Sequence, residues 1–428
     1  MNMTQTGRLI AQLRTALGMT QAELAQRLDV TDKAVSKWER GKSLPDISLF
    51  NRLAAELRVS VIEILSGEIL DVARSSNLDG EAAAREEVDY AKPLSLQPLD
   101  AGDLMVSPYL FGSNLEHTRS CIQGGLSAQL LRNRKFAGKP SACKGCAAEW
   151  YPIGERAVFT FDRPYTRHGE GYHMKRALEC NSLSILNPFP GQTAGLGQHG
   201  LSIQQGKNYL FGAVVRTKGP VTLSVALTDR EGNLVYDCGV IAAESEEWIR
   251  YEIELTPNAA DRDADLRIQW EGEGSVCFGA LSLLPKDHFR GMRRDVVEKM
   301  AEIGIKVLRW PGGNFAGEYS WMDGLLPVDM RAPFQSFLGL ETQPHSMGYD
   351  YHEINTDDFI ALCREIGAEP FITINPCWNT PEENAAWVEY CNGDRSTKYG
   401  RLRAERGYEE PYHVQLWSLG NEFGYGHM

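Results

Sequence analysis

Hydrophobic positions change their spacing along the chain, and each spacing predicts a different kind of structure. Up to about residue 70, leucines recur at helical intervals, which predicts a small all-α unit. Between 149 and 285, short runs alternate apolar and polar residues and are separated by turn residues, which is typical of an antiparallel β-sandwich. From 286 onward, helical patterns alternate with short apolar runs, so parallel strands with crossover helices are expected.

Three helices of this last region have predicted boundaries. Ile303 is expected on the buried face of the first helix, which ends at Gly304, and the second helix is expected to end at Gly367. Thr380, with Pro381 and Glu383, is expected to cap the third helix.

The N-terminal unit carries recognisable helix boundaries. Thr20 and Glu23 form a capping box before one helix, and Thr31 opens the next one. In that second helix Trp38 is expected to face the core with Ala34 and Val35, and Gly41 ends it. A further helix is expected to begin at Ser43, Pro45 and Asp46 and to continue through Leu49, Leu53 and Leu57.

Composition narrows the class of protein. The chain has 428 residues, 43% of them hydrophobic and 24% charged, with a net charge of −13, which excludes a chain wrapped globally around nucleic acid. No apolar run approaches the roughly 18 residues of a membrane helix, and the N-terminus lacks a secretory pattern, so a cytoplasmic protein without membrane contact is expected. Segment 71–93 is rich in Ala, Glu, Arg, Ser and Asp, as in a mobile linker.

No metal or cofactor is expected. The nine cysteines are spread along the chain, and Cys143 and Cys146 form a CxxC without a second pair at zinc spacing. Neither an HExxH motif nor a strand-turn-helix GxGxxG motif occurs.

Two carboxylates follow apolar runs of the barrel-like pattern. Glu422 comes just after the run around Leu416, and Glu116 with His117 comes just after Phe111. In parallel α/β barrels the loops after the strands hold the chemistry, so Glu422 is a candidate acid or base. The alternative for Glu422 is a solvated acid in a helix N-cap region.

The N-terminal block resembles the Cro/C1-type (XRE) helix-turn-helix family, with TQAELAQRL as the first motif helix and TDKAVSKWERG as the recognition helix. The resemblance implies binding of double-stranded DNA through residues 1–70. Gln21 would contact a phosphate, and the residues facing the major groove would be Thr31, Asp32, Lys33, Ser36 and Lys37. The alternative is a helical protein-interaction unit with solvated charges.

The C-terminal region is similar to the family 51 α-L-arabinofuranosidases, which are retaining glycoside hydrolases with a (β/α)8 TIM barrel. The likeness rests on the stretches RWPGGNFAGEYSWMDGLLPVDMRAP, TDDFIALCREIGAEPFITINPCWNTPEENAAWVEYCNG and EEPYHVQLWSLGNE. It implies Glu422 as the catalytic acid/base and an arabinofuranosyl oligosaccharide as substrate. The sugar-binding residues would be Glu116, Arg309, Asn314 and Asn421. Alternatively, Arg309 is a barrel salt-bridge partner, and Gly312 and Gly313 form only a tight turn.

The inserted β-sandwich resembles jelly-roll carbohydrate-binding modules. Trp248 and Trp270 are candidates for stacking on a sugar, although in such strands both are expected in the core. The expected organisation is therefore a helix-turn-helix domain at 1–70, a linker at 71–93, the start of the hydrolase region with the first barrel strand at 94–148, the β-sandwich at 149–285, and barrel strands 2–4 with the acid/base motif at 286–428.

One departure from the family concerns the second carboxylate. A retaining glycosidase needs a nucleophile roughly 5 Å from the acid/base, and the resemblance places it on a later strand. Strands are expected only near Tyr109, Val307, Ile372 and Leu416, which makes an incomplete barrel. Three alternatives follow: a C-terminal polypeptide completes the barrel, the chain pairs with itself as a homo-oligomer, or the chain is a truncated product. The chain alone should hydrolyse arabinofuranosides negligibly.

Two functions of different class follow. The first is an arabinofuranosidase-type hydrolase region joined to a sequence-specific DNA-binding domain. The second is a sugar-responsive transcription regulator that uses a hydrolase-derived, catalytically incomplete region as its sensor.

Overall fold

The computed structural model describes residues 3–46, 49–59, 64, 107–167, 181–336, 346–377 and 379–422. The chain divides into two compact units, Met1–Ala101 and Gly102–Met428. The predicted linker at 71–93 lies outside the described residues. Among those that are described, no helix is both long and apolar enough to cross a membrane.

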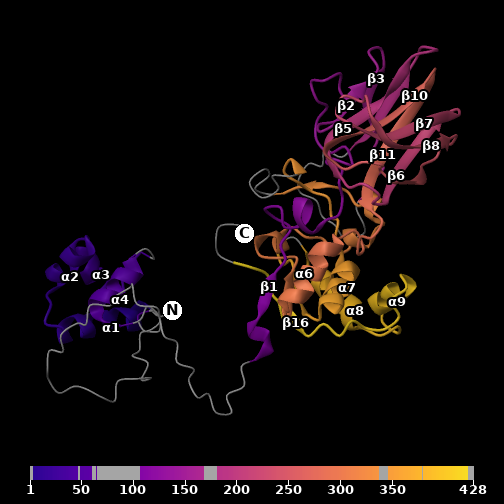
Figure 1. The fold of residues 1–428 in the computed structure, drawn as a ribbon. Helices are drawn as coiled ribbons and strands as arrows, with labels where there is room; N and C mark the ends of the chain where they lie inside the picture. The colour runs from indigo at the N-terminus through magenta and orange to yellow at the C-terminus, as the bar shows by residue number, and fades with distance from the viewer. Residues whose placement is uncertain are drawn as a thin grey trace. The chain divides into compact units, whose positions relative to one another are not determined.

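The N-terminal unit is helical (Figure 1). Its helices are α1 (Met3–Ala16), α2 (Gln21–Leu28), α3 (Asp32–Glu39) and α4 (Phe50–Leu57). The predicted capping box is confirmed, because the Glu23 backbone N–H donates to Thr20 Oγ1 (3.2 Å) and the Thr20 N–H donates to Glu23 Oε2 (2.7 Å). Thr31 caps α3 as expected.

The predicted start of the last helix was wrong. Helix α4 begins at Phe50, while Leu44, Pro45 and Asp46 have no helical structure. Pro and Asp favour turn conformations over helix interiors, and Leu49 lies in a helical turn just before α4, with its N–H donating to the Asp46 carbonyl (2.9 Å). Trp38 is only 5% exposed and packs in the core of this unit, as predicted.

A β-sandwich forms one part of the second unit (Figure 1). Its antiparallel sheets have the orders β2-β5-β10-β7-β8 and β3-β4-β11-β6-β9. The strands are β2 (Tyr151–Ile153), β3 (Val158–Asp162), β4 (Ser182–Asn187), β5 (Thr193–Ile203), β6 (Tyr209–Lys218), β7 (Val221–Thr228), β8 (Val235–Ala243), β9 (Ile249–Leu255), β10 (Asp261–Glu271) and β11 (Gly274–Pro285). Both sheets contribute side chains to one apolar core.

The two candidate tryptophans differ in their surroundings. Trp270 is 3% exposed and lies in the sandwich core, as expected. Trp248 is half-buried outside that core and packs against Tyr165, with ring centroids 5.3 Å apart. The expectation that Trp248 is a core residue was therefore wrong: together with Tyr165 it covers Gly279 of β11 from outside the core.

The sandwich core also includes side chains from before residue 149. Leu131, Phe136, Cys146 and Ala147 pack into it with the strands. The segment ahead of β2 is therefore structurally part of the sandwich, and a boundary at 149 would cut through this core.

A four-stranded sheet forms the second part of this unit. Its order is β1 (Gly112–Asn114), β12 (Val307–Trp310), β15 (Glu369–Thr373) and β16 (Leu416–Ser418), and every neighbouring pair is parallel. The predicted alternation of helix and strand is confirmed by α6 (Arg294–Ile303), α7 (Thr356–Ile366), α8 (Pro381–Asn392) and α9 (Lys398–Glu405). Shorter elements are η2 (Pro108–Leu110), η3 (Ile122–Leu126), η4 (Asn314–Gly317), η5 (Asp323–Leu325), η6 (Val328–Met330), β13 (Phe334–Gln335) and β14 (Tyr349–Asp350).

Two local expectations for this sheet were wrong. The first strand was expected near Tyr109, but η2 occupies that position and β1 begins at Gly112. Ser107 accepts a hydrogen bond from the Tyr109 N–H, and Pro108 at the first helical position favours a helical turn. Ile303 was expected on the buried face of α6 but is 75% exposed, because it lies in the last turn just before the left-handed Gly304.

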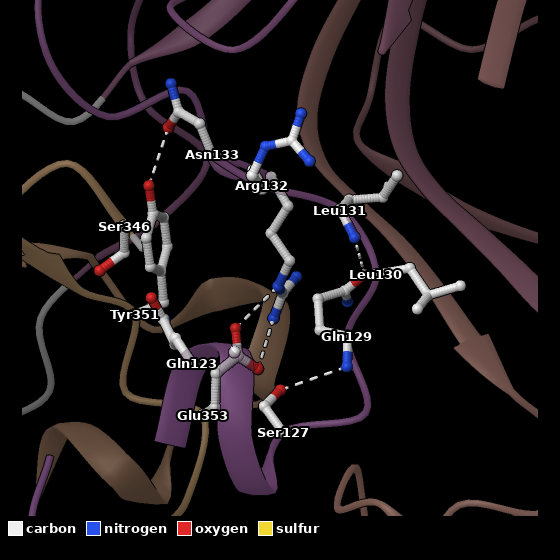
Figure 2. A pocket seen from close by; sticks show the side chains of 12 residues that line it. Gln123, Ser127, Gln129, Leu130, Leu131, Arg132, Asn133, Ser346, Tyr351 and Glu353 are labelled. Carbon is white, nitrogen blue, oxygen red and sulfur yellow. Dashed lines mark hydrogen bonds and ion pairs between the residues drawn. The ribbon is translucent and has the colours of Figure 1, made fainter. Parts of the chain in front are cut away.

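Buried ion pairs join the sandwich to the sheet region. Arg134, in the segment that packs with the sandwich, donates to Asp329 Oδ1 (2.7 Å), Glu353 Oε1 (2.8 Å) and the Leu281 carbonyl (3.3 Å). Its contact with Glu353 lies beside a cavity of about 150 Å³ (Figure 2). Breaking one partner of such a buried pair is costly, so the sandwich and the sheet are coupled.

Candidate active site

The carboxyl ends of the four parallel strands lie along one edge of the sheet, although Arg309 of β12 is level with Phe371 and not with Thr373 of β15. Asn114 of β1 pairs with Arg309 of β12, and Thr373 of β15 pairs with Ser418 of β16. Side chains at and just after these positions therefore project from the same edge of the sheet, where α/β barrels carry their chemistry.

Arg309 connects three of these strand ends. Its Nε donates to Thr373 Oγ1 (2.9 Å) and its Nη2 donates to Asn421 Oδ1 (3.0 Å). A guanidinium only donates, so this contact fixes the orientation of the Asn421 amide. Asn421 Nδ2 then donates to Asn314 Oδ1 (2.6 Å). The alternative of a barrel salt bridge for Arg309 is not observed among the described residues, where its hydrogen-bond partners are a hydroxyl and an amide.

Glu116 lies against the glycine turn that follows β12. Its Oε1 accepts a hydrogen bond from the Phe315 N–H (3.2 Å). A Cβ on Gly312 would lie 2.3 to 2.6 Å from the Cγ, Cβ and Cα atoms of Glu116, and Gly312 has φ +124°. The glycines therefore do more than form a tight turn, because Gly312 also permits the close approach of Glu116.

Glu422 follows this cluster directly in the sequence. Asn421 is half-buried, and Glu422 is exposed with φ 49°. The residues after it lie outside the described part of the chain. The structure thus brings Glu116, Arg309, Asn314 and Asn421 to one edge of the sheet, with Glu422 at its rim.

Several residues beneath the site were missed by sequence reasoning. Thr373 and Asp350 are buried, and His117 was noted only as the neighbour of Glu116. His117 Nδ1 lies 3.0 Å from Asp350 Oδ2, and the Trp310 indole N–H donates to His117 Nε2 (2.9 Å). No sequence signal links positions 117 and 350, because the hairpin that carries Asp350 has no helix or strand periodicity of useful length.

Tyr319 extends this buried cluster. Its hydroxyl donates to the Ile354 carbonyl (3.2 Å), and burial raises the pKa of Tyr319 well above its usual value. The hydroxyl therefore stays protonated and acts as a donor. Among the described residues, no group of three or more potential metal ligands is present.

The candidate DNA-contacting residues lie on and beside α3. Thr31, Asp32, Lys33 and Lys37 are exposed, and Ser36 is half-buried. Thr31 Oγ1 is already engaged as the cap of α3, accepting from the Ala34 N–H (3.2 Å). The Gln21 amide donates to Glu39 Oε2 (2.5 Å), so in this structure it connects α2 to α3.

Comparison with known families identifies both units. Residues 299–427 match the model described as "Alpha-L-arabinofuranosidase 1 domain", and residues 10–64 match the model "Helix-turn-helix". Residues 299–427 thus carry an α-L-arabinofuranosidase domain, and residues 10–64 carry a helix-turn-helix domain.

Individual relatives agree with this assignment. "Probable alpha-L-arabinofuranosidase C" of Aspergillus terreus is 44% identical over 140 residues, which are 32% of this chain and 26% of that protein. "Alpha-L-arabinofuranosidase 1" of Arabidopsis thaliana is 26% identical over 372 residues, covering 79% of this chain and 52% of that protein. The chain thus spans between about a quarter and a half of the length of these relatives.

A solved structure shares the fold. The arabinose-bound MgGH51 α-L-arabinofuranosidase superposes with a TM-score of 0.61 at 20% identity, covering 73% of this chain and 53% of that one. At this identity the likeness concerns the fold of the arabinofuranosidase region.

Proposed function

We propose that the arabinofuranosidase domain binds a terminal α-L-arabinofuranosyl residue at the carboxyl edge of its parallel sheet, with Glu422 as the general acid/base. The observation that carries the proposal is the line of hydrogen bonds from Thr373 through Arg309 and Asn421 to Asn314. It joins strand ends far apart in the sequence and holds polar side chains at one edge of the sheet.

The polarity of this line suits a ring with several hydroxyl groups. Asn421 and Asn314 each use their oxygen as an acceptor within the line. The Asn314 amide nitrogen has no partner among the described residues. It is a donor for a sugar oxygen, whereas the Glu116 carboxylate accepts from a sugar hydroxyl. One N–H of Asn421 is left for the 2-hydroxyl, next to the acid/base.

Glu422 would protonate the glycosidic oxygen as the aglycone leaves and would then activate water. The nucleophile of a retaining mechanism is expected from a strand beyond these four, and none of the described carboxylates is assigned to it. We also propose that the four parallel strands belong to an incomplete TIM barrel, that the sandwich has carbohydrate-binding-module character, and that the protein is cytoplasmic.

Calorimetric titration of the folded chain with L-arabinose and with an aryl α-L-arabinofuranoside tests this function. Arg309→Lys should weaken binding by about tenfold or more, because lysine cannot hold Thr373 and Asn421 at once. Arg230→Lys is the matched control, since Arg230 is an exposed sandwich residue paired with Asp263. Absence of binding to the folded chain, or equal losses in both variants, would contradict the proposal.

We infer that the helix-turn-helix domain binds duplex DNA, with Lys33 and Lys37 supplying contacts from the exposed face of α3. A gel-shift experiment with DNA upstream of the gene tests this at low salt. No shift with a folded domain would contradict it.

A second candidate function, the sugar-responsive regulator, is favoured by the presence of both domains on one chain. Repeating the gel shift with and without arabinose discriminates between the two. A sugar-dependent change in DNA affinity supports the regulator, and identical curves support separate activities.

A further inference from the structure

A closed cluster of rings lies directly behind Glu116, and His117 is at its centre. The His117 ring is fully buried, and its side chain stacks on Phe315 with ring centroids 4.9 Å apart and an interplanar angle of 11°. Tyr319 meets the same imidazole edge-on at 5.6 Å. The imidazole is therefore held by aromatic packing as well as by hydrogen bonds.

The hydrogen bonds determine which nitrogen carries the proton. An indole N–H can only donate, so His117 Nε2, which lies 2.9 Å from Trp310 Nε1, must be the acceptor. The ring proton is then on Nδ1 and is donated to Asp350 Oδ2, 3.0 Å away. Asp350 is fixed in turn, because its Oδ1 accepts from the His352 backbone N–H (2.7 Å).

The Phe315 backbone connects this cluster to the candidate sugar site. The ring of Phe315 rests on His117, while its N–H donates to Glu116 Oε1 (3.2 Å). The backbone N–H of His117 also donates to the Pro311 carbonyl (3.3 Å), just ahead of the glycine turn. His117 therefore contacts the chain both before the glycine turn, at Pro311, and after it, at Phe315.

We propose that His117 is a positioning residue for Glu116. As the neutral Nδ1–H tautomer, bridging Trp310 and Asp350, it fixes the Phe315 N–H that orients the Glu116 carboxylate toward the sugar. His117 does not touch the substrate, and its effect passes through Glu116. The effect of His117 on sugar binding rests on the proposed function, whereas its hydrogen-bond geometry can be tested without sugar.

The sugar-independent test is nuclear magnetic resonance on the full chain. Nitrogen-15 spectra of labelled histidine should show His117 protonated at Nδ1 and accepting at Nε2. Hydrogen exchange at the Phe315 amide should be protected in the unaltered protein and accelerated by about tenfold or more in His117→Phe, which keeps a ring but loses both hydrogen bonds. An Nε2-protonated His117, or unchanged Phe315 exchange in the variant, would overturn the proposal.

His117→Asn is the conservative variant, because its amide nitrogen replaces Nδ1 and keeps the donor to Asp350. It should restore part of the Phe315 protection. If His117→Phe fails to fold, His117→Asn still tests the proposal, since it should show intermediate exchange. Protection equal to that of the unaltered protein would mean that the Trp310 contact is irrelevant and would refute the bridge.

The sugar-dependent test is a double-mutant cycle read by arabinose affinity. His117→Phe should weaken binding by about tenfold in the unaltered background and by less than about twofold when Glu116 is already alanine. Ile185→Ala, in the sandwich core, is the control for general destabilisation and should leave affinity unchanged. Additive effects of His117→Phe and Glu116→Ala would refute action through Glu116. If no variant and no unaltered chain binds arabinose, the sugar function fails while the exchange result still decides the positioning role.

Discussion

Replacing Gly312 by alanine should be more damaging than the same change at other left-handed glycines of this domain. The new Cβ would lie 2.3 Å from Cγ, 2.4 Å from Cβ and 2.6 Å from Cα of Glu116, and the last of these is backbone that cannot rotate away. Backbone strain at φ +124° costs about 1–2 kcal/mol, and overpacking costs about 1–3 kcal/mol more. We expect a total loss of about 2–5 kcal/mol of unfolding free energy.

Two other glycines separate strain from collision. Gly304 has φ +74° and no atom within 4 Å of a new Cβ, so Gly304→Ala should cost only about 1 kcal/mol. A Cβ on Gly313 would lie 3.1 Å from Glu116 Oε1, which is a side-chain atom and not backbone. Gly313→Ala should therefore displace the carboxylate and weaken arabinose binding.

Urea unfolding of the full chain, followed by hydrogen exchange of peptides from the sheet region, measures these differences, and calorimetry measures sugar affinity. The exchange readout is needed because the two compact units need not unfold together. Equal stability losses in Gly312→Ala and Gly304→Ala, with normal arabinose binding in both, would refute the close approach of Glu116 to the turn.

Three further predictions concern the other parts of the chain. Lys37→Ala should weaken DNA binding in a gel shift and reduce its salt dependence without unfolding the domain. Trp38→Ala should cost about 3–5 kcal/mol of stability in thermal melting, and a Trp38→Ala variant as stable as the unaltered domain would contradict the core position of Trp38. In the sandwich, Trp270→Ala should destabilise by a similar amount and Trp248→Ala by clearly less, in urea unfolding; the reverse order would contradict their burial. Burial lowers the pKa of Lys135 from 10.5 to about 7, so above about pH 7 the unfolded chain binds more protons than the folded chain, and stability should rise with pH. The rise should continue to about pH 9, where buried cysteines with raised pKa, such as Cys146, begin to oppose it. Lys135→Met should abolish this rise in unfolding measured against pH, and a rise of the same size in the variant would exclude Lys135 as its source.

The sequence by itself determined the features that depend on neighbouring residues. The capping boxes at Thr20 and Thr380 formed as predicted, because each requires partners only three residues apart. The helix ends at Gly304 and Gly367 also formed, since glycine reaches the left-handed conformation without a steric penalty. The alternation of helices with β12, β15 and β16 followed from apolar spacing.

The tertiary structure decided the features that depend on distant partners. His117 meets Asp350 across 233 residues, and Arg309 meets Asn421 across 112. Hydrophobic periodicity reports which side of an element is buried, but not which polar group lies opposite a given side chain. The same limit explains why Ile303 was misplaced at a helix end and why the first strand was expected too early. A short apolar run fits a helical turn or a strand equally well until the packing of the whole sheet selects one. The cluster behind Glu116 depends on partners far apart in the sequence, so only the tertiary structure shows it.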